Sequence, residues 1–576
     1  MGRRLEEYTH EELIEYIKTL KKQKRFGLVW EDKPENVVRE CETKLPVVKE
    51  VTEKRIENAP GEPTNIIIEG DNYHALSVLN YTHAGKIDVI YIDPPYNTGN
   101  KDFIYNDCYV DKEDTFRHSK WLSFMEKRLK LAKTLLADDG VIFISIDDNE
   151  QATLKLLCDS IFNDSHMVAN FIWEKKRKAS NLSGEVRDVA EYVLCYRNRE
   201  IVPLIASEDI VEQNKPYPFY NTGNKRKKLC FPEKKIFAEM SDGVYKAGDY
   251  LDKKTVVTLC NDIEIKNGLV INSFELIGEW RYSQTKLDTL LDDNERIVLK
   301  GTKLKPYFIN NNERIKYVKT ILSKSNYDVG TNEDGNAELA ALLGNNIFSY
   351  PKPTKLIQKL IQLNGKEDSI VLDFFAGSGT TGQAVMELNK EDGGHRQFIL
   401  VTNNEANGQA DAGAEGIAEK VTYPRIKTVI TGIRPDGTKY SDGISANLRY
   451  FKTDFVEKGK TTDDTREALI TECCDMIRIR ENAFEHIASA PEYRFYKNDK
   501  VFVPIIFDQF AITETWELVE KLNTEKLPVH CYNFSYNRHA NEEEIPEDTE
   551  LTWTACSIPE TVLEVYRKIF RKKKEV

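Results

Sequence analysis

The chain has 576 residues, of which 40% are hydrophobic and 30% charged, with 81 Lys and Arg against 94 Asp and Glu. This length predicts two to four domains, and the apolar content is enough to build their cores. The net charge of −13 argues against a surface that is basic throughout, so any contact with nucleic acid would have to come from a local basic region.

The sequence also argues against several other classes of protein. No apolar run approaches the roughly 18 residues of a transmembrane helix, and no apolar segment follows Met1, so we expect a cytoplasmic protein with no membrane contact. The ten cysteines are scattered and form no Cys-x-x-Cys pair, which predicts neither a disulfide framework nor a metal site.

The N-terminal residues 1–60 are polar and carry apolar residues at helical spacing around Leu13, Ile14 and Ile17. This pattern predicts a helical segment, and the simplest role for its polar side is a solvated face.

A β-α-β unit follows this segment. Residues 65–69 predict a strand, residues 73–83 a helix, and residues 86–92 a second strand that is apolar throughout and therefore buried. Such a unit implies a parallel pair of strands with a right-handed crossover. Asp71 comes directly after the first strand, where it either caps the helix or contacts a ligand at the sheet edge.

The second strand ends in a turn with two prolines, Asp93-Pro94-Pro95-Tyr96. Prolines fix φ and favour extended backbone at the preceding residue, so this turn should hold Asp93 and Tyr96 rigidly. A carboxylate and a neighbouring carbonyl can accept the two hydrogens of an exocyclic amino group, while the aromatic ring stacks on the base. Such acceptors would stabilise the positive charge that grows on the nitrogen during methyl transfer. The alternative is an ordinary loop, for which Asp-Pro and Pro-Pro are also typical.

After this turn, residues 117–137 predict an amphipathic helix, and 141–146, 171–173 and 192–196 predict strands. From 201 to 330 the strand–helix alternation is lost, aromatic residues recur, and 21 Lys and Arg outnumber 18 Asp and Glu. This stretch predicts a separate module inserted into the sheet domain and is the best candidate for reading DNA, although it has no helix-turn-helix or zinc signature.

Two basic runs are candidates for phosphate contacts, because Lys and Arg neutralise backbone phosphates. An isolated run of this kind is more often a solvated face. The candidate residues are Lys175, Lys176, Arg177 and Lys178 in the first run, and Lys225, Arg226, Lys227 and Lys228 in the second.

A glycine-rich loop follows the predicted strand 369–373 and precedes a helix predicted over 380–389. Its glycines would let the backbone approach a ligand, and the helix N-terminus would face a negative group. Gly377 and Gly382 have the spacing of a P-loop, but Gln383 stands where that motif requires Lys, which excludes it. With Gly379, the same glycines also satisfy a dinucleotide fingerprint, which on its own is a weak indication.

Taken together, the two motifs resemble those of the S-adenosylmethionine-dependent DNA amino methyltransferases. The longer string 93–107 is similar to the Mod subunits of Type III restriction–modification systems, which methylate adenine, and the resemblance covers most of residues 27–455. The proline motif precedes the glycine motif by about 280 residues, and in the family this order marks the β class.

The resemblance implies an α/β fold: a Rossmann-like methyltransferase sheet in permuted motif order, with an inserted target-recognition module and N- and C-terminal accessory regions. It implies that Asp93, Pro94, Pro95 and Tyr96 are catalytic and act on an extruded base. It also implies that the segment 348–353 closes the cofactor pocket. The residues implied for binding S-adenosylmethionine are Asp71, Asp373, Phe374, Ala376, Gly377, Ser378, Gly379 and Thr380, with Glu405 after the predicted strand 398–402 for the ribose.

We expect five parts along the chain on this basis. Residues 1–60 form a helical assembly segment, 61–200 the catalytic half of the methyltransferase, 201–344 the target-recognition domain, 345–435 the cofactor half, and 436–576 a mixed α/β interaction domain. Within the last part, 464–488 and 514–523 predict helices and 500–507 a strand.

The resemblance implies double-stranded DNA, a second copy of the chain and a helicase-nuclease restriction subunit as partners. Two alternatives stay open: the N4 amino group of cytosine as the target, and a chain that mainly recognises DNA within a larger restriction complex.

Overall fold

The fold is taken from a computed structural model, which describes residues 9, 28–100, 102–106, 108–176, 186, 188–199, 204–210, 216–252, 255–293, 295–301, 303–309, 315–344, 347–403, 416–535, 542–546 and 549–570. The chain divides into two compact units. One contains residues 1–204 together with 319–576, and the other contains residues 205–318. No helix in the described ranges is long and apolar enough to cross a membrane.

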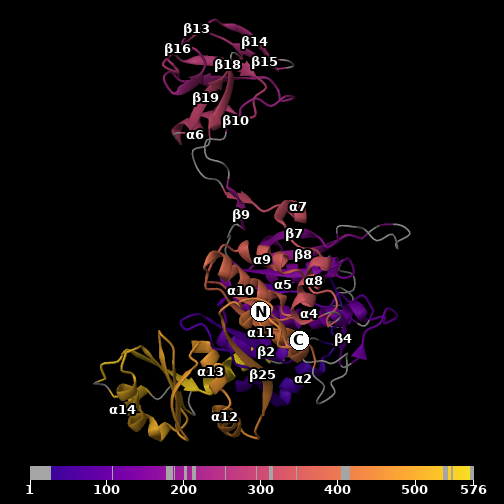
Figure 1. The fold of residues 1–576 in the computed structure, drawn as a ribbon, viewed down its shortest axis with the longest axis vertical. Coiled ribbons are helices and arrows are strands. Elements are labelled where there is room, and N and C mark those ends of the chain that lie inside the picture. The colour runs from indigo at the N-terminus through magenta and orange to yellow at the C-terminus, as the bar shows by residue number, and fades with distance from the viewer. Residues whose placement is uncertain are drawn as a thin grey trace. The chain divides into compact units, whose positions relative to one another are not determined.

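The first unit is built on a mixed sheet of ten strands (Figure 1). Their order is β1 (Lys44–Glu50), β25 (Asn447–Glu457), β2 (Thr64–Glu69), β24 (Gln397–Thr402), β23 (Ile370–Asp373), β3 (Ile87–Ile92), β6 (Leu136–Ile146), β8 (Ala190–Arg197), β7 (Met167–Glu174) and β22 (Ile321–Leu322). The six strands from β25 to β6 run parallel to one another. Their apolar runs match this arrangement, because a central parallel strand is covered on both faces.

The two predicted motifs end neighbouring strands of this sheet. β3 pairs with β23 in parallel, with Val89 opposite Val371 and Ile90 opposite Leu372, all fully buried. The chain leaves β23 towards β24 and leaves β3 in the opposite direction, towards β6. In open α/β sheets, ligands bind at the carboxyl ends of the strands where the winding direction reverses. The fold therefore defines one expected ligand site, between the ends of β3 and β23.

Helices cover both faces of the sheet, because right-handed crossovers that lead in opposite directions place their helices on opposite faces. One group is α3 (Asn72–Thr82), α4 (Arg117–Leu135) and α5 (Gln151–Phe162), which pack side by side. The other is α8 (Asn332–Leu343), α9 (Thr354–Gln362), α10 (Thr380–Asp392) and α11 (Tyr423–Thr431).

Two strand predictions differ from the structure. The strands predicted at 65–69 and 86–92 exist as β2 and β3, but they are not paired, because β24 and β23 of the cofactor half lie between them. The boundaries expected at 60 and 435 are also misplaced with respect to the sheet. Part of the expected helical segment is the strand β1, and β25 is the neighbour of β2, so both strands extend the methyltransferase sheet.

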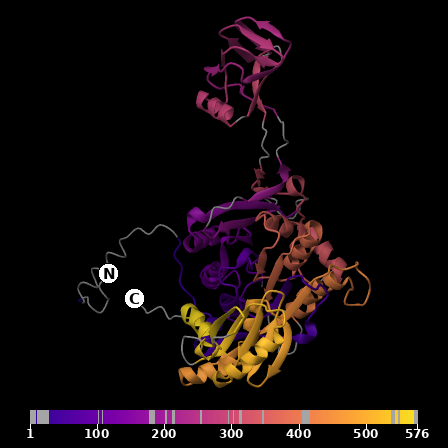
Figure 2. The same cartoon turned by 90° about the vertical axis from the view of Figure 1, so that its left-hand side faces the viewer.

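The C-terminal part adds a five-stranded sheet with two helices, α14 (Ile512–Leu522) and α15 (Glu560–Ile569). Its strands, in sheet order, are β26 (Glu485–Ala490), β27 (Tyr493–Lys497), β28 (Phe502–Ile506), β29 (Val529–Phe534) and β30 (Trp553–Ile558). This part packs on the methyltransferase sheet through α15, whose buried Tyr566 hydroxyl donates to the Pro46 carbonyl (Figure 2, yellow).

The single helix predicted at 464–488 is wrong. Residues 462–470 form α12 and residues 474–481 form α13, after which Asn482 takes a left-handed conformation with φ of 50° and the chain enters β26. Asn tolerates this conformation better than most residues, and it ends the helix.

The second unit, residues 205–318, is mostly β structure around its own core. A seven-stranded sheet and a four-stranded sheet lie within it, with one helix, α6 (Gln284–Asp292). The seven-stranded sheet has the order β10 (Pro216–Pro218), β20 (Lys305–Ile309), β19 (Arg296–Lys300), β12 (Ile236–Glu239), β17 (Leu269–Val270), β16 (Ile263–Lys266) and β13 (Gly243–Tyr245). The four-stranded sheet has the order β11 (Lys227–Phe231), β18 (Phe274–Gly278), β15 (Thr255–Leu259) and β14 (Gly248–Asp252), and β9 (Ile205–Ile210) pairs with β21 (Ile315–Tyr317). The unit lies inside the range 201–344 expected for target recognition, and its function remains a prediction.

Candidate active site

The two motif loops meet at one cavity of about 340 Å³ in the first unit. Asp93, Pro94 and Pro95 line it after β3, and Phe374 and Gly377 line it after β23. Other lining residues include Asp71, Asn72, Phe103, Phe124, Phe348, Phe375, Thr402 and Asn403. The cavity lies where the fold places a ligand, and it combines aromatic walls with three carboxylates, those of Asp71, Asp93 and Asp102.

The turn at Pro94 and Pro95 is held by two side-chain hydrogen bonds. Trp121 of α4 donates its indole N–H to the Pro95 carbonyl at 2.7 Å. Asn97 is fully buried in a left-handed conformation with φ of 59°, and its side chain donates to Glu150 at 2.6 Å. Among the described residues, no hydrogen bond reaches the Pro94 carbonyl. The turn thus keeps the Pro94 carbonyl available as an acceptor on a rigid backbone.

The side chains of Asp93 and Tyr96 belong to a network that the sequence did not predict. Lys352 donates to both carboxylate oxygens of Asp93, at 2.9 and 2.8 Å, and to the Tyr96 hydroxyl at 2.9 Å. The same hydroxyl lies 2.9 Å from Asp93 and 3.0 Å from Glu191 of β8. Lys352 is 8% exposed and Asp93 keeps 27% of its side chain exposed, so the lysine lies behind a carboxylate that faces the cavity.

Two pKa shifts follow from this network. Burial lowers the pKa of Lys352, but the carboxylates of Asp93 and Glu191 outweigh burial, and the net shift is upward. The group therefore stays an ammonium ion at neutral pH. Burial, followed by the charges of Asp93 and Glu191, raises the pKa of Tyr96 well above its ordinary value, so its hydroxyl keeps its proton.

The glycine-rich loop approaches the cavity by its backbone. Gly377 has φ of 48° and Gly379 has φ of 80°, a left-handed region that favours glycine. A Cβ atom on Gly377 would lie 3.3 Å from the Phe348 ring, which also lines the cavity. The Ala376 N–H donates to the Val401 carbonyl at 3.0 Å and fixes the loop on β24.

Asp373 lies behind the glycine-rich loop, and its expected contact with the cofactor stays a prediction. Its side chain is 3% exposed and does not line the cavity. One carboxylate oxygen accepts the Phe375 N–H at 3.0 Å, and the other accepts the Thr381 hydroxyl at 2.5 Å. Burial raises its pKa to about 7, although these hydrogen bonds act in the opposite direction. Asp373 therefore fixes the loop from behind through both of its oxygens.

Ser378 and Thr380 also point their hydroxyls away from the cavity, towards a buried arginine. Arg425 of α11 donates to Ser378 at 3.0 Å, to Thr380 at 2.7 Å and to Gln383 at 2.8 Å. Its side chain is fully buried, and no carboxylate of the described residues lies within 4.0 Å of it. Burial lowers the pKa of Arg425 to about 10, which leaves it charged at neutral pH.

The remaining cofactor predictions have mixed outcomes. Asp71 is the N-cap of α3 and accepts the Tyr73 N–H at 2.7 Å, as one of its two predicted roles required. It also lines the cavity, so the second role stays open as a prediction. Glu405 lies outside the described residues, and Thr402 and Asn403 are the cavity residues at the end of β24.

In the first basic run, Lys175 does not fit the expected phosphate contact. Lys175 is buried and pairs with Asp188 at 2.7 Å and with Glu191 at 3.5 Å, so it supports the Tyr96 network from behind. Lys176 is half-buried, and Arg177 and Lys178 lie outside the described residues.

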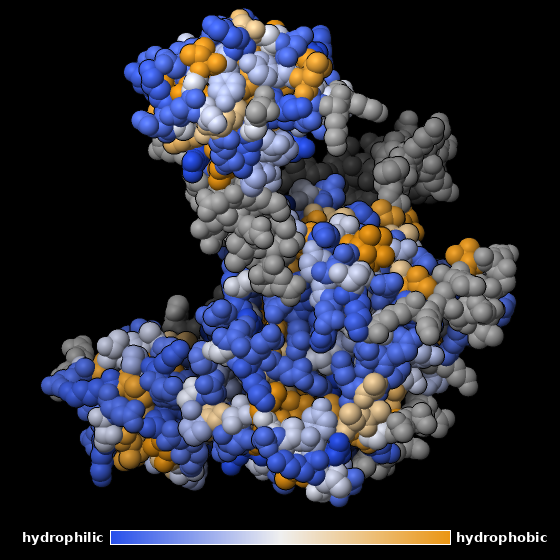
Figure 3. All heavy atoms as spheres, turned by 45° about the horizontal axis from the view of Figure 1, so that its top comes forward, coloured by the Kyte–Doolittle hydropathy of each residue, from blue (hydrophilic) through white to orange (hydrophobic). Residues whose placement is uncertain are grey.

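The second basic run lies on the surface of the second unit. All four side chains are exposed, as a phosphate contact requires: Lys225, Arg226, Lys227 and Lys228. Lys228 pairs with Glu275 at 3.1 Å, and Arg226 donates to the Thr258 hydroxyl at 2.8 Å. The visible face of this unit is mostly hydrophilic, with small apolar spots (Figure 3). Its role in DNA binding remains a prediction.

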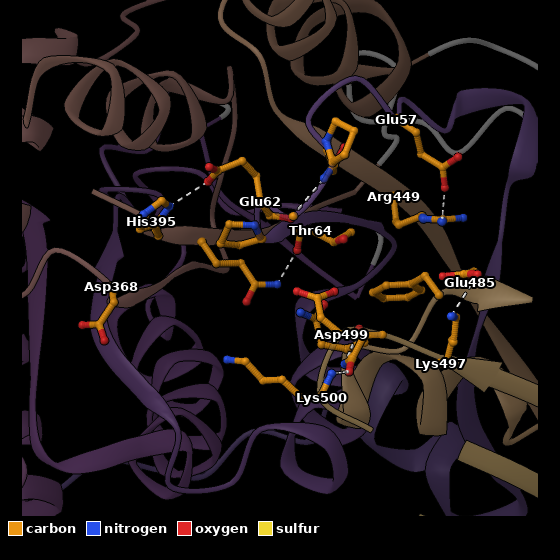
Figure 4. A pocket seen from close by; sticks show the side chains of 18 of the residues that line it. Glu57, Glu62, Thr64, Asp368, His395, Arg449, Glu485, Lys497, Asp499 and Lys500 are labelled. Carbon is orange, nitrogen blue, oxygen red and sulfur yellow. Dashed lines mark hydrogen bonds and ion pairs between the residues drawn. The ribbon is translucent and has the colours of Figure 1, made fainter. Parts of the chain in front are cut away.

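A larger pocket of about 660 Å³ lies between the methyltransferase sheet and the C-terminal sheet (Figure 4). Its charged side chains are mostly paired with one another: His395 with Glu62 at 2.8 Å and Lys497 with Glu485 at 3.7 Å. Because these charges satisfy each other, they do not converge on a ligand. The smaller cavity between the motif loops is the better candidate for the active site.

Sequence reasoning missed Lys352, Glu191 and Arg425. Lys352 lies within the segment 348–353, which the resemblance implies closes the cofactor pocket. Its place in this segment was the only signal in the sequence for Lys352. Glu191 and Arg425 follow ordinary strand and helix patterns, and nothing in the sequence distinguishes them from surface charges.

Comparisons with known proteins show the family to which the chain belongs. The family model described as DNA methylase matches residues 87–407, which include both motifs. The chain is 36% identical over 410 residues to the Mod subunit of the Type III restriction-modification enzyme StyLTI of Salmonella typhimurium, covering 64% of this chain and 57% of that one. It is 33% identical over 390 residues to the Mod subunit of EcoPI of Escherichia phage P1, covering 59% and 58%.

Among solved structures, a putative DNA modification methylase of Thermus thermophilus in complex with S-adenosyl-L-methionine matches with a TM-score of 0.29 and 12% identity, covering 59% of this chain and 90% of that one. The chain spans less than three fifths of the length of the two Mod subunits. The fold and site are those of a doubly wound α/β domain with a ligand cavity at its switch point. Because the family model matches more than half of the chain, the chain belongs to the DNA methylase family.

Proposed function

We propose that the chain is a site-specific DNA methyltransferase that moves a methyl group from S-adenosylmethionine to the N6 amino group of adenine. We further propose that it is the modification and recognition subunit of a Type III restriction–modification system. The observation that carries the first proposal is the single cavity that both the Asp93 turn and the Gly377 loop line. The names of the two Mod relatives support the restriction context. Adenine as the target rests on the resemblance to the Type III Mod subunits.

The residues around the cavity fit the proposed cofactor. A volume of about 340 Å³ lies within the range of roughly 300–1,000 Å³ that is typical of small-molecule pockets. Gly377 leaves open a cradle beside Phe348 that a Cβ atom would narrow. Phe374, Gly377 and Asp71 would hold S-adenosylmethionine, which when bound supplies an electrophilic methyl group on a sulfonium ion.

Asp93, Pro94 and Tyr96 would act on the target base. An exocyclic amino group is a poor nucleophile because its lone pair is delocalised into the ring. The Asp93 carboxylate and the Pro94 carbonyl would accept its two hydrogens and stabilise the positive charge that grows on the nitrogen. Tyr96 would stack on the base, which must first leave the duplex at a cost of a few kcal/mol. No strong general base is required, since the methylated nitrogen releases its proton readily.

The second unit is the proposed reader of the DNA sequence. Its exposed basic run at 225–228 supplies charges suited to phosphate contacts. We also propose a second copy of the chain and a helicase-nuclease restriction subunit as partners. The names of the Mod relatives support a restriction partner.

Incubation of the purified chain with methyl-labelled S-adenosylmethionine and plasmid DNA tests the proposal, with nucleoside analysis after hydrolysis. We expect label in N6-methyladenine. Label in N4-methylcytosine would keep the mechanism and overturn the base assignment. Unlabelled DNA, from a folded chain that binds the cofactor, would favour a chain whose main role is recognition. Co-expression with a helicase-nuclease subunit, followed by copurification, tests the Type III context separately.

A further inference from the structure

The candidate active site contains a buried lysine that uses one of the two acceptors proposed for the target base, the Asp93 carboxylate. Lys352 comes just before α9, 259 residues along the chain from Asp93. Its three ammonium hydrogens have three acceptors within 2.9 Å: the two Asp93 oxygens and the Tyr96 hydroxyl. The Asp93 carboxylate, which should accept the amino group of the target base, therefore already accepts hydrogen bonds from the ammonium group of Lys352.

The ammonium group also lies near the aromatic ring that should stack on the base. Its nitrogen is 5.1 Å from the centroid of Tyr96 and 5.8 Å from that of Trp173. Its hydrogen bond to the Tyr96 hydroxyl places it at the hydroxyl end of that ring. Lys352 thus matches two properties of the methylated intermediate: a positive nitrogen bonded to Asp93, and contact with the Tyr96 ring.

A second acceptor lies next to the first. Glu191 Oε2 is 3.6 Å from the Lys352 nitrogen, and Glu191 is 9% exposed. The gap is less than about 1 Å longer than an ordinary charged hydrogen bond of 2.7–2.9 Å. A small movement of the ammonium group from Asp93 towards Glu191 would free Asp93 and leave the lysine paired.

We propose that Lys352 is a positioning residue that stands in for the target amino group between turnovers and passes its ammonium group to Glu191 when that group arrives. This inference rests on the proposed methyltransferase function. In this proposal, Lys352 and Glu191 keep the Asp93 carboxylate ionised and correctly placed while no base is bound.

Lys352 needs two alternative partners because an unpaired charge in a buried site has a high free energy. Without Lys352, the Asp93 carboxylate would have no cation beside it, while the Glu191 carboxylate stays close by. With a base on Asp93 and no second acceptor, Lys352 would be a buried unpaired cation. Transfer to Glu191 avoids both states.

The other charged and titratable groups around Asp93 belong to several elements. Tyr91 on β3 keeps its proton, because burial raises its pKa far above 10. Lys175, at the end of β7, pairs with Glu191 at 3.5 Å and with Asp188. Lys175 cannot take the place of Lys352 directly, because Lys175 contacts Glu191 and not Asp93.

The test is the pH profile of kcat/KM for DNA methylation by the full chain. In Lys352→Met, we expect the acid limb to move up by about one pH unit or more, because Asp93 has lost the cation that keeps it ionised. Below both acid limbs, the loss relative to wild type should therefore be at least about tenfold larger than at pH 9. A lysine needed only for packing would lower activity by the same factor at every pH, and that result would overturn the proposal.

Two further variants sharpen the test. Lys355→Met removes an exposed lysine three residues away that pairs with Asp328, and it should reproduce the wild-type profile. Glu191→Gln removes the second acceptor but leaves Lys352 on Asp93. It should lower kcat at all pH values without moving the acid limb upward, and wild-type kcat in this variant would contradict the transfer step.

A measurement without turnover separates this inference from the proposed function. Difference infrared titration, with Asp93→Asn as the reference, reports the carboxyl band of Asp93 directly. We expect its midpoint to lie higher in Lys352→Met than in the wild type, and equal midpoints would overturn the proposal. A wild-type chain that transfers no methyl group would refute the proposed function, and the infrared comparison would still decide the role of Lys352.

Discussion

Replacement of Arg425 by methionine should weaken cofactor binding although the side chain does not line the cavity. The guanidinium group joins Ser378 and Thr380 of the glycine-rich loop to Gln383 of α10 with three hydrogen bonds of 2.7–3.0 Å. Each hydrogen bond to a charged group contributes about 1.5–3 kcal/mol net. The burial of a guanidinium group without a nearby carboxylate opposes this gain by several kcal/mol. We therefore expect a loss of about 1–3 kcal/mol in stability, far less than the sum of the three bonds.

Cofactor affinity should fall by about tenfold to a hundredfold, because a ligand at Gly377 would then rest on a loop that has lost these hydrogen bonds. Isothermal titration with S-adenosylhomocysteine measures the effect. Arg434→Met is the matched control. This arginine lies in the same region but donates to Ala341 and Thr438 on the surface, so its loss should leave affinity unchanged. Wild-type affinity in a folded Arg425→Met chain would refute the assignment of Arg425 to the loop.

Three further predictions concern the two motifs. Asp93→Ala should abolish methylation while cofactor affinity stays within a few-fold of wild type in the same titration; loss of cofactor binding would show that Asp93 does not act on the base. Gly377→Ala should lower cofactor affinity, and stability by about 1 kcal/mol, because the residue has φ of 48° and a Cβ atom would lie 3.3 Å from Phe348; thermal unfolding with and without ligand measures both effects. The third concerns Asp373, whose pKa is about 7 in the folded chain against an ordinary value of 3.8. Between these values the folded state binds the additional proton, so this residue makes stability fall as pH rises from about 4 to 7. Asp373→Asn should flatten that fall in denaturant titrations across this range, and an unchanged slope would contradict the shift.

The sequence predicted the parts of the fold that depend on local patterns. The apolar runs of β3 and β23 and the turns that follow them identified both sides of the site, because a buried parallel strand and a rigid proline turn are encoded by adjacent residues. The amphipathic pattern of α4 was equally clear, and Trp121 and Met125 are fully buried there.

Long-range pairing was beyond these patterns. β1 pairs with β25 across about 400 residues, and nothing in the string 44–50 indicates which strand it will join. The same limit explains why β2 and β3 were expected to be neighbours. In the structure, β24 and β23 of the cofactor half lie between them.

The part of the site that the sequence did not predict consists of single charged residues that only the fold brings together. Lys352, Glu191 and Arg425 stand alone in the sequence, and their chemistry depends on burial next to a partner more than 40 residues away. A lysine in a basic run is expected to be exposed to solvent. Lys175 is instead buried against Glu191, which nothing in the sequence predicts.

The central claim is that this chain methylates adenine at one DNA sequence through the Asp93 turn. Long-read modification sequencing of DNA from cells that express the chain alone tests it most directly, with cells expressing Asp93→Ala as the control. We expect N6-methyladenine on one strand of a single asymmetric motif in the wild type and none in the control. An unmodified genome, with folded and cofactor-binding protein recovered from the same cells, would contradict the claim.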